Sequence, residues 1–495
     1  MEPQKGLHRP SGIDVIEHVI SARHGFIAYI PLIIATIALL IAARADVFFY
    51  NPGVDAYQCY ATAFWFGSKT TQLLPASQCQ FIPQFAQYHS FPLEYPPLSL
   101  LIFSLPLLVP LANYPIVFAL CMALTAFFIY WLLLRVGPRG AGSVFAACLL
   151  VGCLVTAFAR FDLIPAALTL LCLILAERKH WTLAYVSLAL GVLTKLYPIV
   201  LFPLLFLEEQ HNKADFFLPD SSITLKKIPT VFLRTIQNSR NWHWKNGLTF
   251  IGLVFGVTAF SAAFNSKGAF SWVSYMGYRP FQVESIGSAL LWLASFLGVP
   301  IEWKTTFGSL NTISPIAGVI SQSFVILFCL GYIHILIQQW RGKMDLIQAS
   351  LASLLVLVAT GKVFSPQYLL WLIPLLAYSA AGNRRLLLYW GGISVLTTLI
   401  FPIYYLVIPI IIDSALVPGF LPVIFLRDGL FVLLTLAYLF NFLNLRERSA
   451  NPGINLVTLP QIQAYRKVTL RMDQAARIVP RKVLLTFECP DRRLW

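Results

Sequence analysis

Long apolar runs, separated by short polar segments, fill most of the chain between residues 25 and 445. Most are continuous and approach the roughly 20 residues that a membrane-spanning helix needs, whereas strands of a transmembrane barrel alternate over roughly 10. The pattern predicts an all-α protein, a polytopic bundle of transmembrane helices. The runs lie at 25–43, 97–111, 114–134, 141–159, 163–176, 181–194, 196–207, 247–264, 286–298, 315–337, 346–360, 366–380, 386–402, 403–412 and 424–444.

Basic residues between the runs orient the bundle, because cytoplasmic loops of membrane proteins are enriched in Lys and Arg. The basic segments are Arg135 with Arg139, Arg178 with Lys179, the 208–246 loop, Arg341 with Lys343, Arg384 with Arg385, and the tail after Leu445. With these in the cytoplasm, about twelve spans remain and both termini are cytoplasmic. The runs 97–111, 286–298 and 403–412 are then re-entrant or juxtamembrane on the outer side. Several prolines, Pro106 and Pro110 among them, argue against a continuous first segment.

This topology divides the chain into five parts. Residues 1–24 form a cytoplasmic N-terminal tail, and the run that begins near Gly25 is expected to be a signal anchor that stays in the membrane. The tail at the other end contains a candidate amphipathic helix around 461–478, which we expect at the membrane surface. The remaining parts are an N-terminal transmembrane module, 25–207, which contains the first outer loop, 46–96; a basic cytoplasmic loop, 208–246; a C-terminal transmembrane module, 247–445; and the basic cytoplasmic tail, 446–495.

Composition narrows the class of protein further. The 495 residues are 58% hydrophobic and 12% charged, whereas soluble domains are roughly 45–50% apolar and about 25% charged. A soluble multidomain enzyme, a disordered chain and a secreted disulfide scaffold are excluded. The net charge of +15 lies beside the apolar runs, so we expect contact with anionic membrane lipids and no nucleic-acid partner. Cys59 and Cys79 share the first outer loop and are either a disulfide or two free thiols.

The topology places five polar clusters on the outer face. They are Asp46 to Tyr95, Arg160 to Asp162, Lys195 to Tyr197, Asn265 to Ser285, and Gly361 to Tyr368. Charged groups at the ends of membrane spans are costly unless they are paired or used. The clusters therefore predict an extracytoplasmic active site or substrate path.

Several of these residues have both a structural and a functional interpretation. Asp55 follows an Asn-Pro-Gly turn, so it is either a helix N-cap or a general base held at the membrane surface. Arg160 and Asp162 are either a salt bridge that closes a hairpin or an anion-binding arginine oriented by an aspartate. Lys195 either snorkels to the interface or faces a lipid phosphate.

The two C-terminal clusters are also ambiguous. Arg279 precedes a proline and is expected to be extended, while Glu284 and Ser285 suit the start of the helix that follows. Glu94 stands at the mouth of an apolar segment, where ordinary helix-start chemistry does not explain it. Past Lys362, a Ser-Pro pair starts a span, and Gln367 and Tyr368 should face an outer cavity.

In this order the clusters resemble the GT-C fold membrane glycosyltransferases, and within them glycosyltransferase family 87, the polyprenol-phosphate-mannose-dependent mannosyltransferases. The resemblance covers about residues 25–445 and implies a GT-C-type bundle. It also implies that Asp55 is the catalytic base; Asp46, the nearby alternative, lacks the tyrosine pattern that follows. The matching stretches are Val54-Asp-Ala-Tyr57, Glu94-Tyr-Pro-Pro-Leu98, Arg160-Phe-Asp162, Leu193-Thr-Lys-Leu-Tyr-Pro198, Arg279-Pro-Phe-Gln-Val-Glu-Ser285 and Ser365-Pro-Gln-Tyr-Leu-Leu-Trp371.

The chemistry of such a donor agrees with this assignment. A sugar on polyprenyl phosphate already carries a good leaving group, so one carboxylate that accepts the proton of the acceptor hydroxyl is enough. Cations must neutralise the departing phosphate, and Lys195, Arg279 and Arg160 are the candidates. We expect no metal and no cofactor, because the donor has one phosphate and the chain has no Asp-x-Asp motif. Expected substrate-binding residues are Tyr57, Glu94, Tyr95, Asp162, Glu284, Lys362, Gln367 and Tyr368.

With this resemblance we expect an inverting hexosyltransferase of the plasma membrane that acts on a glycan or glycolipid acceptor on the extracytoplasmic face. The resemblance alone implies that the transferred sugar is mannose. The main alternative is a multi-pass flippase or transporter of lipid-linked sugars. A transporter places ionisable residues near the bilayer midplane and shows repeat symmetry. No repeat is evident here, and the polar clusters gather on one face, which favours the enzyme.

Overall fold

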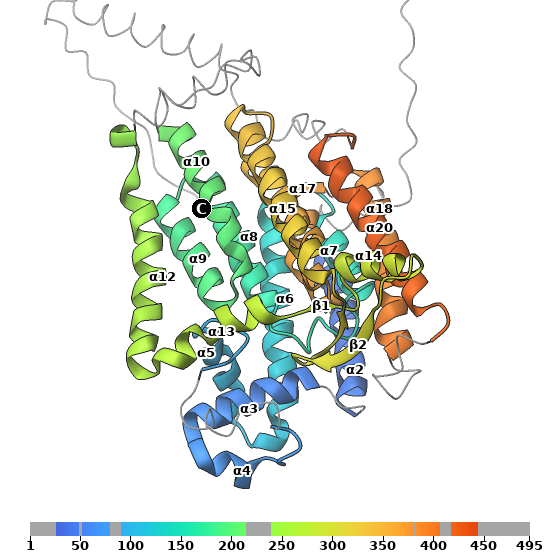
Figure 1. Cartoon of the computed structure of the whole chain (residues 1–495). Helices are drawn as coiled ribbons and strands as arrows, with labels where there is room; N and C mark the ends of the chain where they lie inside the picture. Colours follow the sequence, from blue (N-terminus) through green and yellow to red (C-terminus); the bar gives the residue numbers. More distant parts are fainter. Residues whose placement is uncertain are drawn as a thin grey trace, which may run out of the picture. The chain divides into compact units, whose positions relative to one another are not determined.

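The computed structural model describes residues 26–48, 52–79, 91–213, 239–380, 382–405 and 417–443. The N-terminal tail, most of the 208–246 loop, and the C-terminal tail with its candidate helix at 461–478 lie outside the described residues. The described residues belong to one compact unit, which ends at Leu443, and they are mostly helical (Figure 1).

The N-terminal half begins with α2 (Ile30–Phe48), which continues beyond the end predicted for the first span. Helices α3 (Pro52–Phe66) and α4 (Thr70–Leu73) lie in the predicted first outer loop, and α5 (Ser99–Ser104) lies in the apolar run after it. A disulfide joins Cys59 of α3 to Cys79. Longer helices continue the chain: α6 (Tyr114–Val136), α7 (Ala141–Leu150), α8 (Leu163–Glu177), α9 (Trp181–Thr194) and α10 (Leu201–Lys213).

The C-terminal half contains α12 (Trp244–Phe264), α13 (Ser266–Tyr278), α14 (Ile286–Ser295) and α15 (Ala317–Trp340). It continues with α16 (Leu346–Ala359), α17 (Leu369–Ala380), α18 (Arg384–Thr398) and α20 (Phe420–Leu439). Helices α8, α9, α16 and α17 bury most of their side chains, whereas α12 and α15 bury few of theirs. Exposed apolar side chains on long helices are what contact with lipid requires.

Five helices in the described part of the chain are long and apolar enough to cross a membrane: Leu111–Val136, Trp244–Phe264, Ala317–Trp340, Arg384–Tyr404 and Phe420–Leu439. Other apolar helices, such as α8 and α16, are shorter than the roughly 20 residues that a span needs. The fold is therefore a membrane-type helical protein, and the number of about twelve spans stays a prediction.

The expectation of an all-α protein is wrong in one region. Three strands form an antiparallel sheet in the order β1-β3-β2, with β1 at Phe281–Gln282, β2 at Glu302–Thr306 and β3 at Ser309–Ile313. Strands β2 and β3 form a hairpin whose turn residues, Phe307 and Gly308, both have positive φ. Short segments that alternate polar and apolar residues around a two-residue turn containing glycine are a hairpin signal, and such segments lie outside the long apolar runs.

Candidate active site

The centre of the candidate site is a buried ion pair between two neighbouring helices. Asp162 precedes α8 and Lys195 follows α9, and these helices pack against each other. Lys195 Nζ lies 2.5 Å from Asp162 Oδ1, and the indole nitrogen of Trp371 donates a hydrogen bond to the same oxygen. Lys195 therefore does not snorkel to the surface. The ion-pair partner of Asp162 is Lys195, which goes against the salt bridge with Arg160 that was one of the two interpretations of that pair.

Aromatic rings surround the ammonium group of Lys195. Its Nζ lies 4.9 Å from the ring centre of Phe161, 5.2 Å from that of Trp371 and 5.5 Å from that of Tyr95. Trp371 is itself stacked between Tyr197 and Tyr368, at 4.2 and 4.0 Å between ring centres. Aromatic faces stabilise a cation that has lost water, so the cage keeps a charged lysine in a buried place.

Helix α3 meets this cage through one face near its N-terminus. Tyr57 stacks on Phe103 at 4.4 Å and contacts the edge of Phe161, while Tyr95 contacts Phe161 as well. The backbone of Gly53 lies against the guanidinium group of half-buried Arg160: a Cβ atom on Gly53 would stand 2.4 Å from Arg160 Nη1. The structure thus brings Tyr57, Tyr95 and Arg160, from clusters that were expected on one face, to the Lys195 cage.

Glu94 and Arg279 are held by the hairpin and by α13. The Tyr275 hydroxyl lies 3.0 Å from Glu94 Oε1 and 2.8 Å from the carbonyl oxygen of Phe307. Arg279 Nη2 donates to Ser309 Oγ at 3.0 Å, so the sheet that was not predicted positions a predicted cation. Glu94 is within electrostatic range of Lys195 and of Tyr368, which connects this group to the cage.

The last predicted cluster lies between α16 and α17. Lys362 Nζ donates to the carbonyl oxygen of Gly277 at 3.1 Å. Tyr368 lies in the short helix η10 (Pro366–Tyr368) together with half-buried Gln367, and its ring stacks on Trp371. Tyr368 therefore lines the cage, while Lys362 ties its segment to the end of α13.

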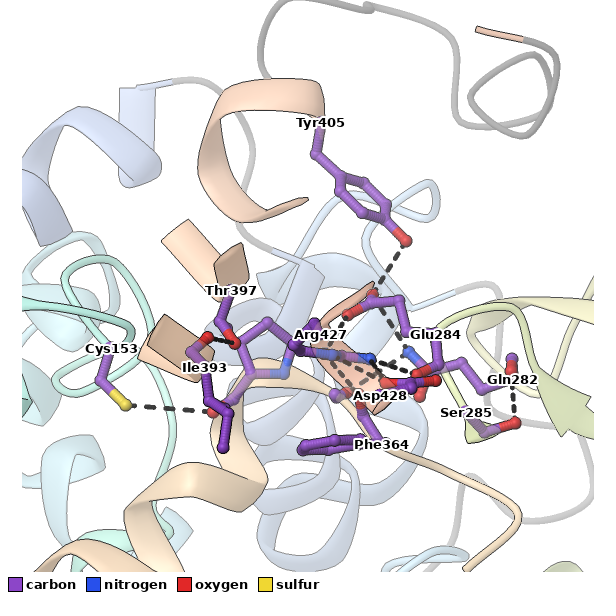
Figure 2. Close-up of polar contacts among 12 residues, drawn as sticks. Cys153, Gln282, Glu284, Ser285, Phe364, Ile393, Thr397, Tyr405, Arg427 and Asp428 are labelled. Atoms are coloured by element: carbon purple, nitrogen blue, oxygen red, sulfur yellow. Dashed lines mark hydrogen bonds and ion pairs between the residues drawn. The ribbon is translucent and has the colours of Figure 1, made fainter. Parts of the chain in front are cut away.

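Glu284 has a different environment from the other predicted substrate-binding residues. It is buried, and its carboxylate accepts a hydrogen bond from Tyr405 at 2.9 Å and lies 3.7 Å from Arg427 (Figure 2). The predicted helix start is confirmed next to it, because the hydroxyl of Ser285 caps α14. Arg427 and Asp428 were not among the predicted site residues. Two charged residues in the apolar run 424–444 were nevertheless a signal, because such charges are rare without a role.

Asp55, the predicted base, lies in the first turn of α3, which begins at Pro52, so the N-cap interpretation is wrong. A carboxylate in the first turn is favoured by the helix dipole. Its side chain is half-buried, and no hydrogen bond or ion pair links it to another described residue. The helical repeat places it on the side of α3 opposite to Gly53 and Tyr57, so the structure does not bring Asp55 together with the Lys195 cage.

Burial raises the pKa of the Asp55 carboxyl above 3.8, the value of the free side chain. If this group is the base, it works only when ionised, so we expect kcat/KM to fall in acid around an inflection above pH 3.8. The measurement is the pH dependence of kcat/KM, which reports groups of the free enzyme. The residual activity of Asp55→Asn should lack this acid inflection; an unchanged inflection in that variant would assign it to another residue.

Comparison with known proteins identifies the class of protein. The sequence model of glycosyltransferase family 87 matches residues 93–217, a stretch that contains Glu94, Arg160 and the Asp162–Lys195 pair. No curated protein and no solved structure matches the chain significantly. The family match confirms the predicted transferase activity and, with the long apolar helices, indicates a membrane glycosyltransferase. Within the described residues no group of three or more His, Cys, Asp or Glu side chains could hold a metal ion.

Proposed function

We propose that this protein transfers mannose from a polyprenyl-phosphate donor to a glycan or glycolipid acceptor on the extracytoplasmic face of the plasma membrane. The observation that carries this proposal is the aromatic cage around Lys195, with Arg160 and Arg279 beside it. Cations bind a phosphate, and aromatic faces suit the apolar side of a sugar ring. The surrounding helices are apolar enough for contact with a lipid chain.

In the proposed reaction Asp55 accepts the proton of an acceptor hydroxyl. The acceptor oxygen attacks the anomeric carbon, the bond from that carbon to the phosphate oxygen breaks, and polyprenyl phosphate leaves with the electron pair. Lys195, Arg160 and Arg279 stabilise the charge that grows on the phosphate. Attack from the face opposite to the leaving group inverts the anomeric centre, so a β-linked donor gives an α-linked product. The atoms balance without a metal or a cofactor.

Lys195 and Asp162 form an ion pair with each other, and this pairing decides the roles that we propose for them. Lys195 is held by Asp162 at 2.5 Å, so it is fixed in place before a phosphate arrives. Fixed cations are effective in catalysis because they need no reorganisation during the reaction. Tyr57, Glu94, Tyr95, Lys362, Gln367 and Tyr368 are the proposed substrate contacts, and Asp162 is the proposed orienting group.

The direct test uses the purified protein in lipid nanodiscs with radiolabelled polyprenyl-phosphate mannose and a membrane-glycan extract. We expect label in the glycan or glycolipid fraction, and none when the donor is a nucleotide sugar. Polyprenyl-phosphate glucose and a polyprenyl-phosphate pentose serve as donor controls. Movement of intact donor across a vesicle bilayer, with no new glycosidic bond, would instead establish a transporter.

Cysteine labelling can test separately on which side of the membrane the site lies. Ser68, before α4, and Lys343, before α16, are both exposed. In a background with Cys121, Cys329 and Cys489 replaced by alanine, we expect an impermeant thiol reagent to label S68C in intact cells and K343C only after permeabilisation. The reverse labelling pattern would contradict the extracytoplasmic site.

A further inference from the structure

We propose that Arg427 is a positioning residue that holds together the two chain segments carrying Arg279 and Tyr368. This inference rests on the proposed function of the Lys195 cage, which supplies the reaction to be measured. Arg427 is fully buried in α20, so its guanidinium acts on the site through the backbone of other residues rather than on the substrate.

The guanidinium of Arg427 bonds to backbone on two sides, as Figure 2 shows. Nη2 donates to the carbonyl oxygen of Glu284, and Nη1 donates to the carbonyl oxygen of Phe364 at 3.3 Å. Its Cζ also lies 4.0 Å from the centre of the Phe364 ring. One side chain thereby joins the segment before α14 to the segment before α17.

The carboxylates on either side hold the guanidinium in this orientation. Arg427 Nε donates to Asp428 Oδ1 at 2.9 Å, and Nη1 lies 3.7 Å from Glu284 Oε2. Tyr405 fixes Glu284 from the other side. Arginine suits this role because its rigid, planar group presents five donors in fixed directions, whereas lysine offers one flexible point charge.

A second link joins the same two segments nearer to the site. The backbone nitrogen of Gln282 donates to the carbonyl oxygen of Lys362 at 2.9 Å, and the Gln282 amide lies 3.4 Å from Ser365 Oγ. Arg279 lies a few residues before this link on one segment, and Tyr368 lies a few residues after it on the other. Both links together fix the distance between a proposed phosphate-binding cation and a ring of the cage.

A role of Arg427 in stabilising the fold alone explains these contacts less well than a positioning role. A buried ion pair adds little net stability, because desolvation offsets the attraction between the charges. A buried arginine within a span is also costly. Here the guanidinium donates hydrogen bonds to carbonyl groups of the two segments that lead into the candidate site. A role in helix packing alone would not require these bonds.

The test compares Arg427→Lys with the triple variant R427M/E284Q/D428N. The lysine variant keeps a positive charge but cannot reach both carbonyl groups, and the triple variant removes all three charges together. In both we expect the KM for polyprenyl-phosphate mannose to rise about tenfold or more, with the acceptor KM within about twofold; tenfold corresponds to about 1.4 kcal/mol. Using both variants covers the case in which one of them fails to fold.

Glu209→Gln is the matched control, because Glu209 is also fully buried and hydrogen-bonded, to Asn246 at 2.6 Å, in a different cluster. We expect this variant to lower the melting temperature while the donor KM stays unchanged. A folded Arg427→Lys protein with the wild-type donor KM would overturn the proposal. So would a parallel change in both KM values and the melting temperature that Glu209→Gln reproduces.

Hydrogen exchange provides a measurement that does not depend on activity. We expect Arg427→Lys to speed amide exchange in peptides that cover 281–285 and 362–368, and not in those around Glu209. Unchanged exchange in both peptides would overturn the positioning role even if no substrate is turned over. Failure of the wild-type protein to use the donor, with faster exchange in the variant, would overturn the proposed function alone.

Discussion

Asp55→Asn is expected to abolish transfer while the protein remains folded and able to bind donor. Asparagine has nearly the same size, but it cannot accept the proton of the acceptor hydroxyl. General-base catalysis contributes roughly 10²–10⁴-fold, and we expect kcat to fall by a factor of this order. The loss of the carboxylate from the first turn of α3 should cost only about 0.3–1 kcal/mol of stability through the helix dipole, so the melting temperature should change little.

Asp46→Asn is the control for this experiment, because Asp46 is the nearby aspartate that the sequence offers as an alternative base. We expect this variant to retain most of its activity. Near wild-type turnover of Asp55→Asn together with an inactive Asp46→Asn would assign the base to Asp46. Activity in both variants would contradict general-base catalysis by either residue.

Arg279→Ala and Lys195→Ala are expected to impair the use of donor more than the use of acceptor. Each removes a cation from the place where negative charge leaves, and a hydrogen bond to a charged group contributes about 1.5–3 kcal/mol. The donor kcat/KM should therefore fall about 10–150-fold in steady-state kinetics with varied donor. An increase confined to the acceptor KM would remove both residues from the phosphate site.

The two substitutions leave different groups without their former partner, so their expected effects on stability differ. Arg279 donates to a serine hydroxyl, so its removal leaves a neutral group. Removal of Lys195 leaves Asp162 buried without its partner, which costs about 3–5 kcal/mol of stability. The double variant K195M/D162N removes both charges, and we expect it to fold better than Lys195→Ala while the donor defect persists.

The sequence predicted the elements that depend on local pattern. Long apolar runs became helices because backbone groups in an apolar environment must form hydrogen bonds within their own segment, and Ser285 caps α14 as its position suggested. Clusters far apart along the chain were expected on one face, and Tyr57, Arg160 and Lys195 do meet around one cage. Their distances could not be predicted, because packing between helices is decided by contacts over long sequence separations.

The ion-pair partners of the charged residues could not be predicted from the sequence. Arg160 and Asp162 are near neighbours along the chain, yet the aspartate pairs with Lys195, because the antiparallel contact of α8 and α9 brings those ends together. Glu284 was expected to face substrate, but an arginine from a distant span lies beside it. A buried charge takes the partner that the tertiary fold supplies, and that partner is set by topology.

The absence of a side chain at Gly53 determines the position that the guanidinium group of Arg160 can occupy. A methyl group there would lie 2.5 Å from Arg160 Cζ as well as against its terminal nitrogen, far inside the van der Waals separation of carbon atoms. Because the obstructed atoms are the free end of a long side chain, alanine would leave the helices in place and turn the guanidinium elsewhere. Glycine at position 53 therefore lets the Arg160 guanidinium lie against the N-terminal end of α3. Any larger residue at this position would displace that positive charge.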